Sequence, residues 1–140
     1  MGRIIGIDYG RKRTGIAVTD PLQIIAGGLE TIPSSEVEKW LEHYMNDQTV
    51  ERIVVGRPTM LNGTDSETMN VQIKPFLNRL KNKFPCMAID TFDERFTSKL
   101  AVSAMIEGKM KKKDRRNKSN IDKMSATILL QSYLESLKKK

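Results

Sequence analysis

Cysteine and histidine are almost absent from this sequence, which has one of each among its 140 residues. A single cysteine, Cys86, excludes an internal disulfide and favours a reducing compartment, so we expect a cytoplasmic protein. Its apolar neighbours predict that Cys86 is buried. With His43 as the one histidine, neither a zinc site nor a nucleophile–histidine pair can readily be built.

Long hydrophobic runs are also missing. No apolar stretch approaches the roughly 20 residues that a membrane helix needs, and the first three residues lead into a short apolar run without a cleavage site, so we expect no signal peptide and no membrane partner. Hydrophobic residues make up 39% and charged residues 29% of the chain, which is a globular composition. The length suits one domain, and we expect residues 1–140 to form it.

Positive charge is present in excess and is concentrated in one segment. The net charge is +7, and residues 109–123, "KMKKKDRRNKSNIDK", carry eight Lys or Arg against two Asp, which is +6 of that total. Such a segment favours a polyanionic partner, although a solvated loop has the same composition. The candidate phosphate contacts in it are Lys111, Lys112, Lys113, Arg115 and Arg116.

Hydrophobic patterning predicts an α/β fold. Strands are expected at residues 3–7, 15–19, 24–32, 51–55 and 87–92, and helices near 35–45, 69–84, 97–106 and 121–138. A meander followed by β-α-β crossovers predicts a five-stranded mixed sheet with helices on both faces.

Three local signals refine that arrangement. Ser35 and Glu38 have capping-box spacing at the start of the first helix. Pro75 predicts a kink or break near Lys74. The pair Gly27-Gly28 predicts a bulge or a close backbone approach in the third strand.

Three acids fall at the ends of the expected elements: Asp8 after the first strand, Glu94 after the last strand and Asp122 at the start of the last helix. Functional groups in α/β sheets gather at the carboxyl ends of strands. Three carboxylates there would repel one another unless a hard cation such as Mg²⁺ or Mn²⁺ joined them. Two such ions can assist phosphoryl displacement. Basic side chains beside Asp8 would then meet a phosphate backbone; they are Arg11, Lys12 and Arg13.

Each acid also has a simpler explanation. Asp8 could accept hydrogen bonds within the turn before Gly10. Glu94 could be a solvated charge beside Arg95, and Asp122 could stabilise a helix N-terminus. Only the combination of the three points to chemistry.

Four motifs in order resemble the YqgF family, whose members are described as Holliday junction resolvases or pre-16S rRNA nucleases. They are "GIDYGRKRTGIAVTD", "VVGRP" followed by Asn62-Gly63, "DERFTS" and "NIDKMSATILLQSYLE", and together they span nearly the whole chain. The resemblance implies a ribonuclease H-like fold and a nuclease triad of Asp8, Glu94 and Asp122 that binds divalent metal. It also implies a cytoplasmic bacterial protein that matures the end of small-subunit ribosomal RNA.

Several alternatives stay open at this point. The substrate could be pre-rRNA or branched DNA, cut by an endonuclease or an exonuclease. The chain could instead be a nucleic-acid or ribosome-binding factor with an idle nuclease site, with the small subunit as a partner. It could be a monomer or a homodimer, because a resolvase must cut two strands symmetrically. Arg57, which stands where an apolar residue is common in the family, is a further candidate phosphate contact.

The basic segment yields a test by salt dependence. If about four of its cations meet phosphates, log affinity for nucleic acid should fall with log salt with a slope of about −3 to −4 from these contacts. Neutralising Lys111, Lys112, Arg115 and Arg116 together should remove that part of the slope and weaken all sequences similarly. An unchanged slope in equilibrium titrations would assign the segment to solubility alone.

Overall fold

The computed structural model describes residues 2–97 and 118–138, with side chains from residue 123 onward in the second segment. The strands are β1 (Arg3–Tyr9), β2 (Arg13–Thr19), β3 (Ala26–Pro33), β4 (Val50–Arg57) and β5 (Ala88–Asp93). The helices are α1 (Val37–Asp47), α2 (Lys74–Lys83) and α5 (Lys118–Lys138), with short turns η1 (Ser34–Glu36), η2 (Met69–Ile73) and η3 (Glu94–Phe96). Except for Thr97, the helix expected near residues 97–106 lies outside the described residues, as does most of the basic segment.

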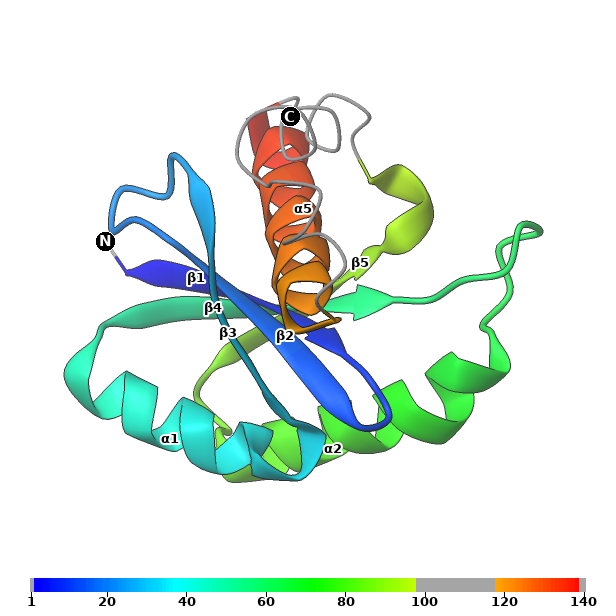
Figure 1. The fold of residues 1–140 in the computed structure, drawn as a ribbon, viewed down its shortest axis with the longest axis horizontal. Helices are drawn as coiled ribbons and strands as arrows, with labels where there is room; N and C mark the ends of the chain where they lie inside the picture. Colours follow the sequence, from blue (N-terminus) through cyan, green and yellow to red (C-terminus); the bar gives the residue numbers. More distant parts are fainter. Residues whose placement is uncertain (1, 98–117, 139–140) are drawn as a thin grey trace.

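The strands form one mixed sheet in the order β3-β2-β1-β4-β5. β1, β2 and β3 pair antiparallel, and β4 and β5 continue the sheet in parallel with β1. Helices α1 and α2 lie under one face of this sheet, and α5 crosses the other face (Figure 1). The expected five-stranded α/β arrangement with helices on both faces is confirmed.

Alternation along the strands divides the apolar side chains into two buried clusters. Ile5 and Ile7 of β1 pack with Leu41 of α1 and Phe76 of α2. The neighbouring residue Ile4 belongs to the second cluster, which packs against α5. β1 is the middle strand of the sheet, and because it contributes to both clusters it is buried on its two faces.

The close approach of α5 depends on glycines in the sheet. A Cβ added to Gly6 of β1 would stand 2.8 Å from Cβ of Leu130, and one added to Gly28 of β3 would stand 3.0 Å from Oγ1 of Thr127. The β2–β3 register also shifts between Ile16 and Ala17, opposite Gly28. Both the bulge and the close approach predicted for the glycine pair are therefore confirmed.

Two expected details have different outcomes. The capping box is wrong, because α1 begins without a side-chain cap and Ser34 of η1 is instead buried, where its hydroxyl donates to the carbonyl of Gly10 at 2.6 Å. Of the kink or break predicted near Lys74, the structure has no break: η2 is a π-helical turn that passes without a gap into α-helix at Lys74, one residue before Pro75. A proline lacks the N–H that a continuous α-helix would require there.

The prediction that Cys86 is buried is wrong. This residue is exposed in the turn between α2 and β5, because the short connection after Phe84 carries it past the end of the apolar core.

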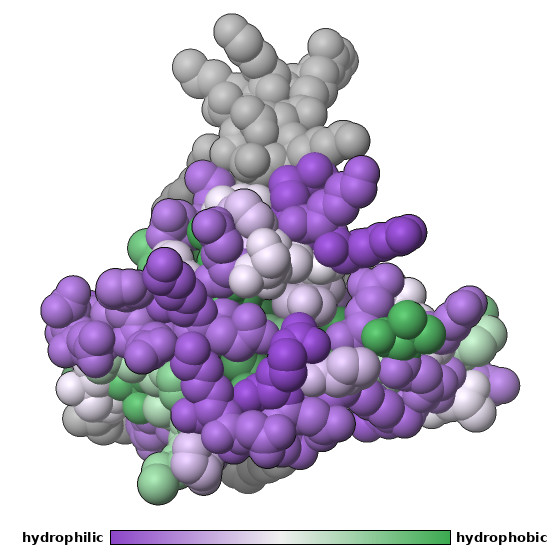
Figure 2. All heavy atoms as spheres, turned by 90° about the horizontal axis from the view of Figure 1, so that it is seen from below, coloured by the Kyte–Doolittle hydropathy of each residue, from purple (hydrophilic) through white to green (hydrophobic). Residues whose placement is uncertain are grey.

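Figure 2 shows that the outward face of α1 and α2 is largely hydrophilic. Among the described residues, no helix combines the length and apolar character that crossing a membrane would demand.

Gly6→Ala tests the contact between α5 and the sheet. The new methyl group would overlap Leu130 Cβ, which cannot move without the helix, so we expect a loss of about 1–3 kcal/mol of unfolding free energy. Gly27→Ala is the matched control, because a Cβ at Gly27 meets nothing within 4 Å. Urea denaturation should show Gly27→Ala at or above wild-type stability, and equal stability of the two variants would contradict this packing.

Candidate functional site

Asp8 reaches the α5 face of the sheet at the carboxyl end of its middle strand. Side chains alternate along β1, and Ile5 and Ile7 pack on the opposite face, towards α1 and α2. Asp8 therefore shares the α5 side with Gly6. It pairs in register with Gly15 of β2, which carries no side chain beside the carboxylate.

Glu94 follows the edge strand β5 and contributes to the same α5 face of the sheet as Asp8. It is the first residue of η3, directly after β5. Its Oε1 atom lies 2.9 Å from the position that a Cβ on Gly56 would occupy, at the end of β4. The missing side chain of Gly56 therefore makes the space into which the Glu94 carboxylate folds.

Both carboxylates line one hollow of about 320 Å³. The hollow is completed by the hydroxyl side chains of Thr97 and Ser125 and by the apolar side chains of Ile128 and Leu129 of α5. The structure thus brings together Asp8 and Glu94, which lie far apart in the sequence. Hydroxyl groups and a partly apolar wall surround them.

Asp122 belongs to α5, three residues before Ser125. Residues three apart lie on the same side of a helix. Its side chain is outside what the structure describes, so its place in the triad stays a prediction. Among the side chains that are described, no group of three histidine, cysteine or acidic residues gathers in a way that could hold a metal ion.

The pKa values of Glu94 and of the adjacent Asp93 are shifted in opposite directions. Desolvation raises the pKa of the Glu94 carboxyl, and the charges of Asp8 and then Asp93 raise it further. The residue as a whole is exposed, but its carboxylate is turned inward against Gly56. The pKa of Asp93 is lowered, chiefly by hydrogen bonding to Arg95, so its charge is compensated while Glu94 faces a like charge.

The candidate phosphate contacts occupy different surroundings. Arg11, Lys12 and Arg13 are exposed at the β1–β2 hairpin, close in sequence to Asp8. Arg57 is half-buried and pairs with Asp65, which also accepts from Lys74 at 2.9 Å. The candidates of the basic segment lie outside the described residues; these are Lys111, Lys112, Lys113, Arg115 and Arg116. Their contacts with nucleic acid all stay predictions.

Some residues of the site were missed in the sequence. Gly56 belongs to the "VVGRP" motif, but nothing in the sequence indicated its close contact with the Glu94 carboxylate. Ser125 could have been found from its spacing of three after Asp122 in a helix. Arg95 holds Asp93 through several hydrogen bonds, the shortest of them 2.7 Å, and no sequence pattern indicated that pair.

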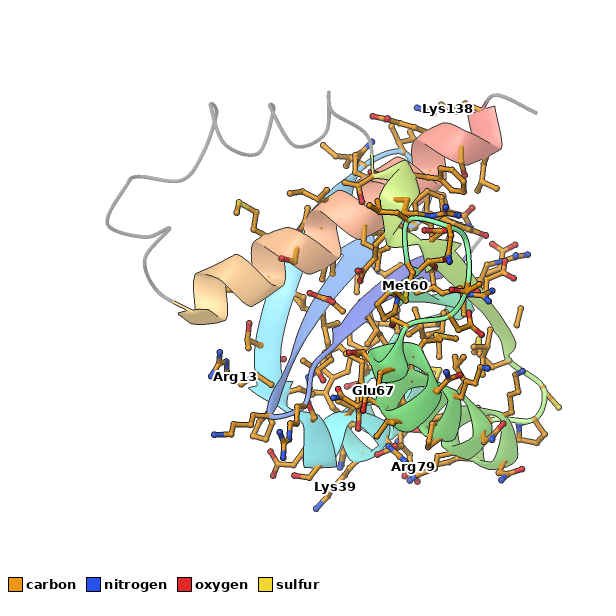
Figure 3. The ribbon with its side chains drawn as sticks, turned by 90° about the vertical axis from the view of Figure 1, so that its right-hand side faces the viewer. Arg13, Lys39, Met60, Glu67, Arg79 and Lys138 are labelled. Atoms are coloured by element: carbon orange, nitrogen blue, oxygen red, sulfur yellow. The ribbon has the colours of Figure 1, made fainter. Side chains whose placement is uncertain are left out.

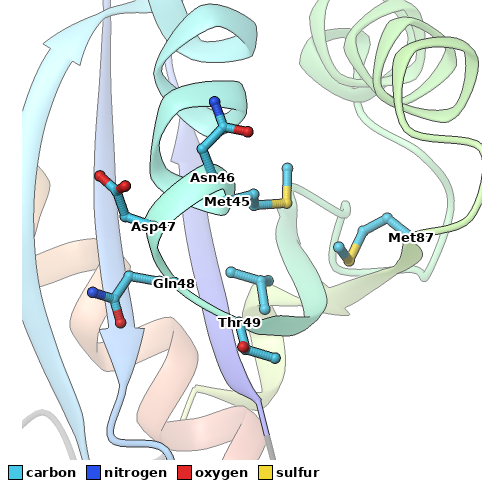
Figure 4. Close-up of a pocket in the computed structure, with 7 residues that line it drawn as sticks. Met45, Asn46, Asp47, Gln48, Thr49 and Met87 are labelled. Carbon is cyan, nitrogen blue, oxygen red and sulfur yellow. The ribbon is translucent and has the colours of Figure 1, made fainter.

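Another hollow lies at the opposite end of the sheet. Met45, Thr49 and Met87 are among the residues that line it, where α1 ends and β4 and β5 begin (Figure 4). It contains Asp47 as its one acidic side chain. The convergence of two carboxylates distinguishes the hollow at Asp8 and Glu94.

Comparison with known proteins gives consistent relatives. A family model described as "RuvX: Holliday junction resolvase" matches residues 2–136. A protein of Phocaeicola vulgatus named "Putative pre-16S rRNA nuclease" is 54% identical over 138 residues, covering 99% of each chain. A protein of Bacteroides fragilis with the same name is 52% identical over 136 residues, covering 97% of this chain and 98% of its own.

Solved structures share the fold at low sequence identity. The structure titled "T. thermophilus RuvC in complex with Holliday junction substrate" aligns with a TM-score of 0.60 at 12% identity, over 99% of this chain and 96% of that one. The fowlpox virus Holliday junction resolvase aligns with a TM-score of 0.54 at 14% identity, over 96% and 99%. The expected ribonuclease H-like fold is confirmed.

The raised pKa of Glu94 predicts a pH-dependent stability in metal-free protein. The folded state binds the proton of this carboxyl more tightly than the unfolded state does. Stability is therefore retained below the ordinary glutamate pKa and lost as pH rises through the raised value. Glu94→Gln removes the ionised form, so its melting temperature in EDTA should exceed that of wild type by a margin that grows over this pH interval. A margin independent of pH would contradict the assignment.

Proposed function

Since the chain belongs to the RuvX family, we propose that it is a metal-dependent nuclease of structured nucleic acid, acting on the 5′ end of pre-16S rRNA. The observation that carries this proposal is the meeting of Asp8 and Glu94 in one hollow at the carboxyl edge of the sheet. Residues 1–140 would act as one nuclease domain.

The residues present fit a divalent cation. Carboxylate oxygens from two strand ends converge, and desolvation, followed by the charge of Asp8, raises the pKa of Glu94. Hydroxyl groups of Thr97 and Ser125 line the same hollow and can hold waters around an ion. Mg²⁺ and Mn²⁺ prefer such oxygen ligands and retain water in their coordination. Asp8, Glu94 and Asp122 would be the residues that hold the metal.

Bound metal would supply charge stabilisation for an in-line displacement at phosphorus and lower the pKa of the attacking water. The contribution of the chain itself is to position the two carboxylates. The backbone of β1 fixes Asp8, and Gly56 leaves the space in which Glu94 is oriented. Ile128 and Leu129 exclude bulk water from one wall of the hollow, which strengthens the electrostatic interactions inside it. The hairpin cations Arg11, Lys12 and Arg13 would hold the phosphate backbone at the edge.

Relatives at 50% identity and above support the RNA substrate through their names, and we therefore favour pre-rRNA on the small ribosomal subunit in the cytoplasm. The family description supports a second candidate, resolution of four-way DNA junctions. A resolvase would act as a homodimer, whereas an RNA-processing nuclease could act as a monomer. A purely binding role would keep affinity without turnover.

Asp8→Asn should reduce kcat by more than about 100-fold because it removes a carboxylate charge that would hold the metal. Nucleic-acid affinity should fall little, since Asp8 does not attract phosphate. The assay would use purified protein with Mg²⁺ or Mn²⁺ on a 16S precursor RNA and on a four-way DNA junction. Asp47→Asn is the matched control, because it removes an equal charge from the exposed end of α1.

Cleavage by Asp8→Asn at the wild-type rate would overturn the assigned site. Wild-type protein that binds both substrates and cleaves neither would instead favour the binding factor. Cleavage of the junction alone, by a dimer, would favour the resolvase.

A further inference from the structure

The loop between β4 and η2 forms a stiff projection, here called the finger loop and comprising residues 58–66. Its two sides meet at an isolated bridge between Thr59 and Asp65. The N–H of Met60 donates to the carbonyl of Thr64 at 2.9 Å, and the N–H of Gly63 donates to the carbonyl of Met60 at 2.9 Å. Gly63 has φ +88, a backbone conformation for which glycine is suited.

Side chains stiffen both the tip and the base of the finger loop. At the tip, Oδ1 of Asn62 accepts from the N–H and the hydroxyl of Thr64, at 3.1 and 2.7 Å. At the base, the Ser66 hydroxyl donates to the carbonyl of Pro58 at 2.7 Å. Asp65 is held there by Arg57 and Lys74. The tip is therefore presented in a defined conformation.

The tip carries apolar side chains that contribute little to the core. Leu61 is 96% exposed and Met60 is 53% exposed. Phe96 of η3 is 65% exposed, and the Arg95 guanidinium lies 5.5 Å from the centre of its ring. A rigid loop with a leucine in solvent gains no folding stability from that leucine. Exposed apolar residues grouped in this way mark a binding surface.

Arg95 joins this surface to the carboxylate site. Its Nη1 donates to the carbonyl of Leu61 at 3.3 Å, and Nη1 also lies 3.9 Å from the position of a Cβ on Gly63. The same guanidinium donates to Asp93. Glu94 lies between Asp93 and Arg95 in the chain, so the finger loop and the catalytic acid share one support. Figure 3 shows Met60 on the finger loop.

We propose that Leu61 packs against an unpaired nucleobase that flanks the phosphodiester at the Asp8–Glu94 hollow. This inference rests on the proposed function and adds recognition of unpaired nucleotides beside the cleavage point. Apolar side chains that insert between bases stabilise unstacked nucleic acid, and arginine and aromatic faces stack on bases. The surface combines these side-chain types, and the hydrogen bond from Arg95 to the carbonyl of Leu61 joins it to the residue that follows Glu94 of the proposed nuclease site.

The test uses equilibrium binding without divalent cations, so that no cleavage occurs. Two RNA duplexes would be compared at fixed monovalent salt, identical except that one contains a single unpaired base. Fluorescence anisotropy should show wild type binding the duplex with the unpaired base about tenfold more tightly. Leu61→Ala should reduce this preference to near unity while leaving affinity for the paired duplex unchanged. Leu61→Met, which keeps the apolar volume, should retain it.

Leu22→Ala is the matched control, because Leu22 is 64% exposed in the β2–β3 loop, far along the chain from the site. It should keep the full preference. Thermal melting of all variants should match wild type, since both leucines are in solvent. The proposal would be overturned if Leu61→Ala kept the preference for the unpaired base, if it lost affinity equally for both duplexes, or if wild type showed no preference. An unchanged preference in Leu61→Ala would favour a protein as the partner of the tip.

Failure of this proposal is distinguishable from failure of the nuclease assignment. Wild type that prefers the unpaired base through Leu61 but never cleaves with Mg²⁺ or Mn²⁺ would refute only the nuclease. Asp8-dependent cleavage with an unaltered preference in Leu61→Ala would refute only the role of the tip.

Discussion

The direct packing of α5 onto the backbone of the sheet is the constraint on which the candidate site depends. Gly6 and Gly28 let the helix approach where any side chain would meet Leu130 or Thr127. The same approach brings Leu129 close to Gly56, and the hollow that remains holds the Asp8 and Glu94 carboxylates. Absent side chains at three strand positions thus create both the contact and the cavity.

The cost of this arrangement is the proximity of two like charges. Desolvation raises the pKa of Glu94, and the charges of Asp8 and then of the adjacent Asp93 raise it further, while hydrogen bonding to Arg95 lowers the pKa of Asp93. Arg95 has two contacts beside this site, because its guanidinium donates to Asp93 and also to the carbonyl of Leu61 in the finger loop. A site that is unfavourable when empty gains the most from a divalent cation. At Glu94, the stability of the metal-free fold and the proposed role in metal binding therefore oppose each other.

Much of the fold could be predicted, because periodicity and turn residues report local structure directly. The five strands of a mixed sheet followed from the apolar runs, and the helical irregularity near Lys74 followed from Pro75. The capping box at Ser35 was wrong because tertiary packing used the preceding Ser34 to hold the β1–β2 hairpin. The meeting of Asp8 and Glu94 followed from strand order, whereas the space at Gly56 and the pair of Asp93 with Arg95 depend on contacts that no local pattern reports.

The central claim is that Asp8 and Glu94 together hold a divalent cation. Anomalous diffraction from crystals soaked in Mn²⁺ tests it most directly, because the metal position is observed independently of activity. We expect an anomalous peak in the hollow within about 2.2 Å of a carboxylate oxygen from each of the two residues. Manganese bound elsewhere, or bound to one of these carboxylates while the other points away, would contradict the claim.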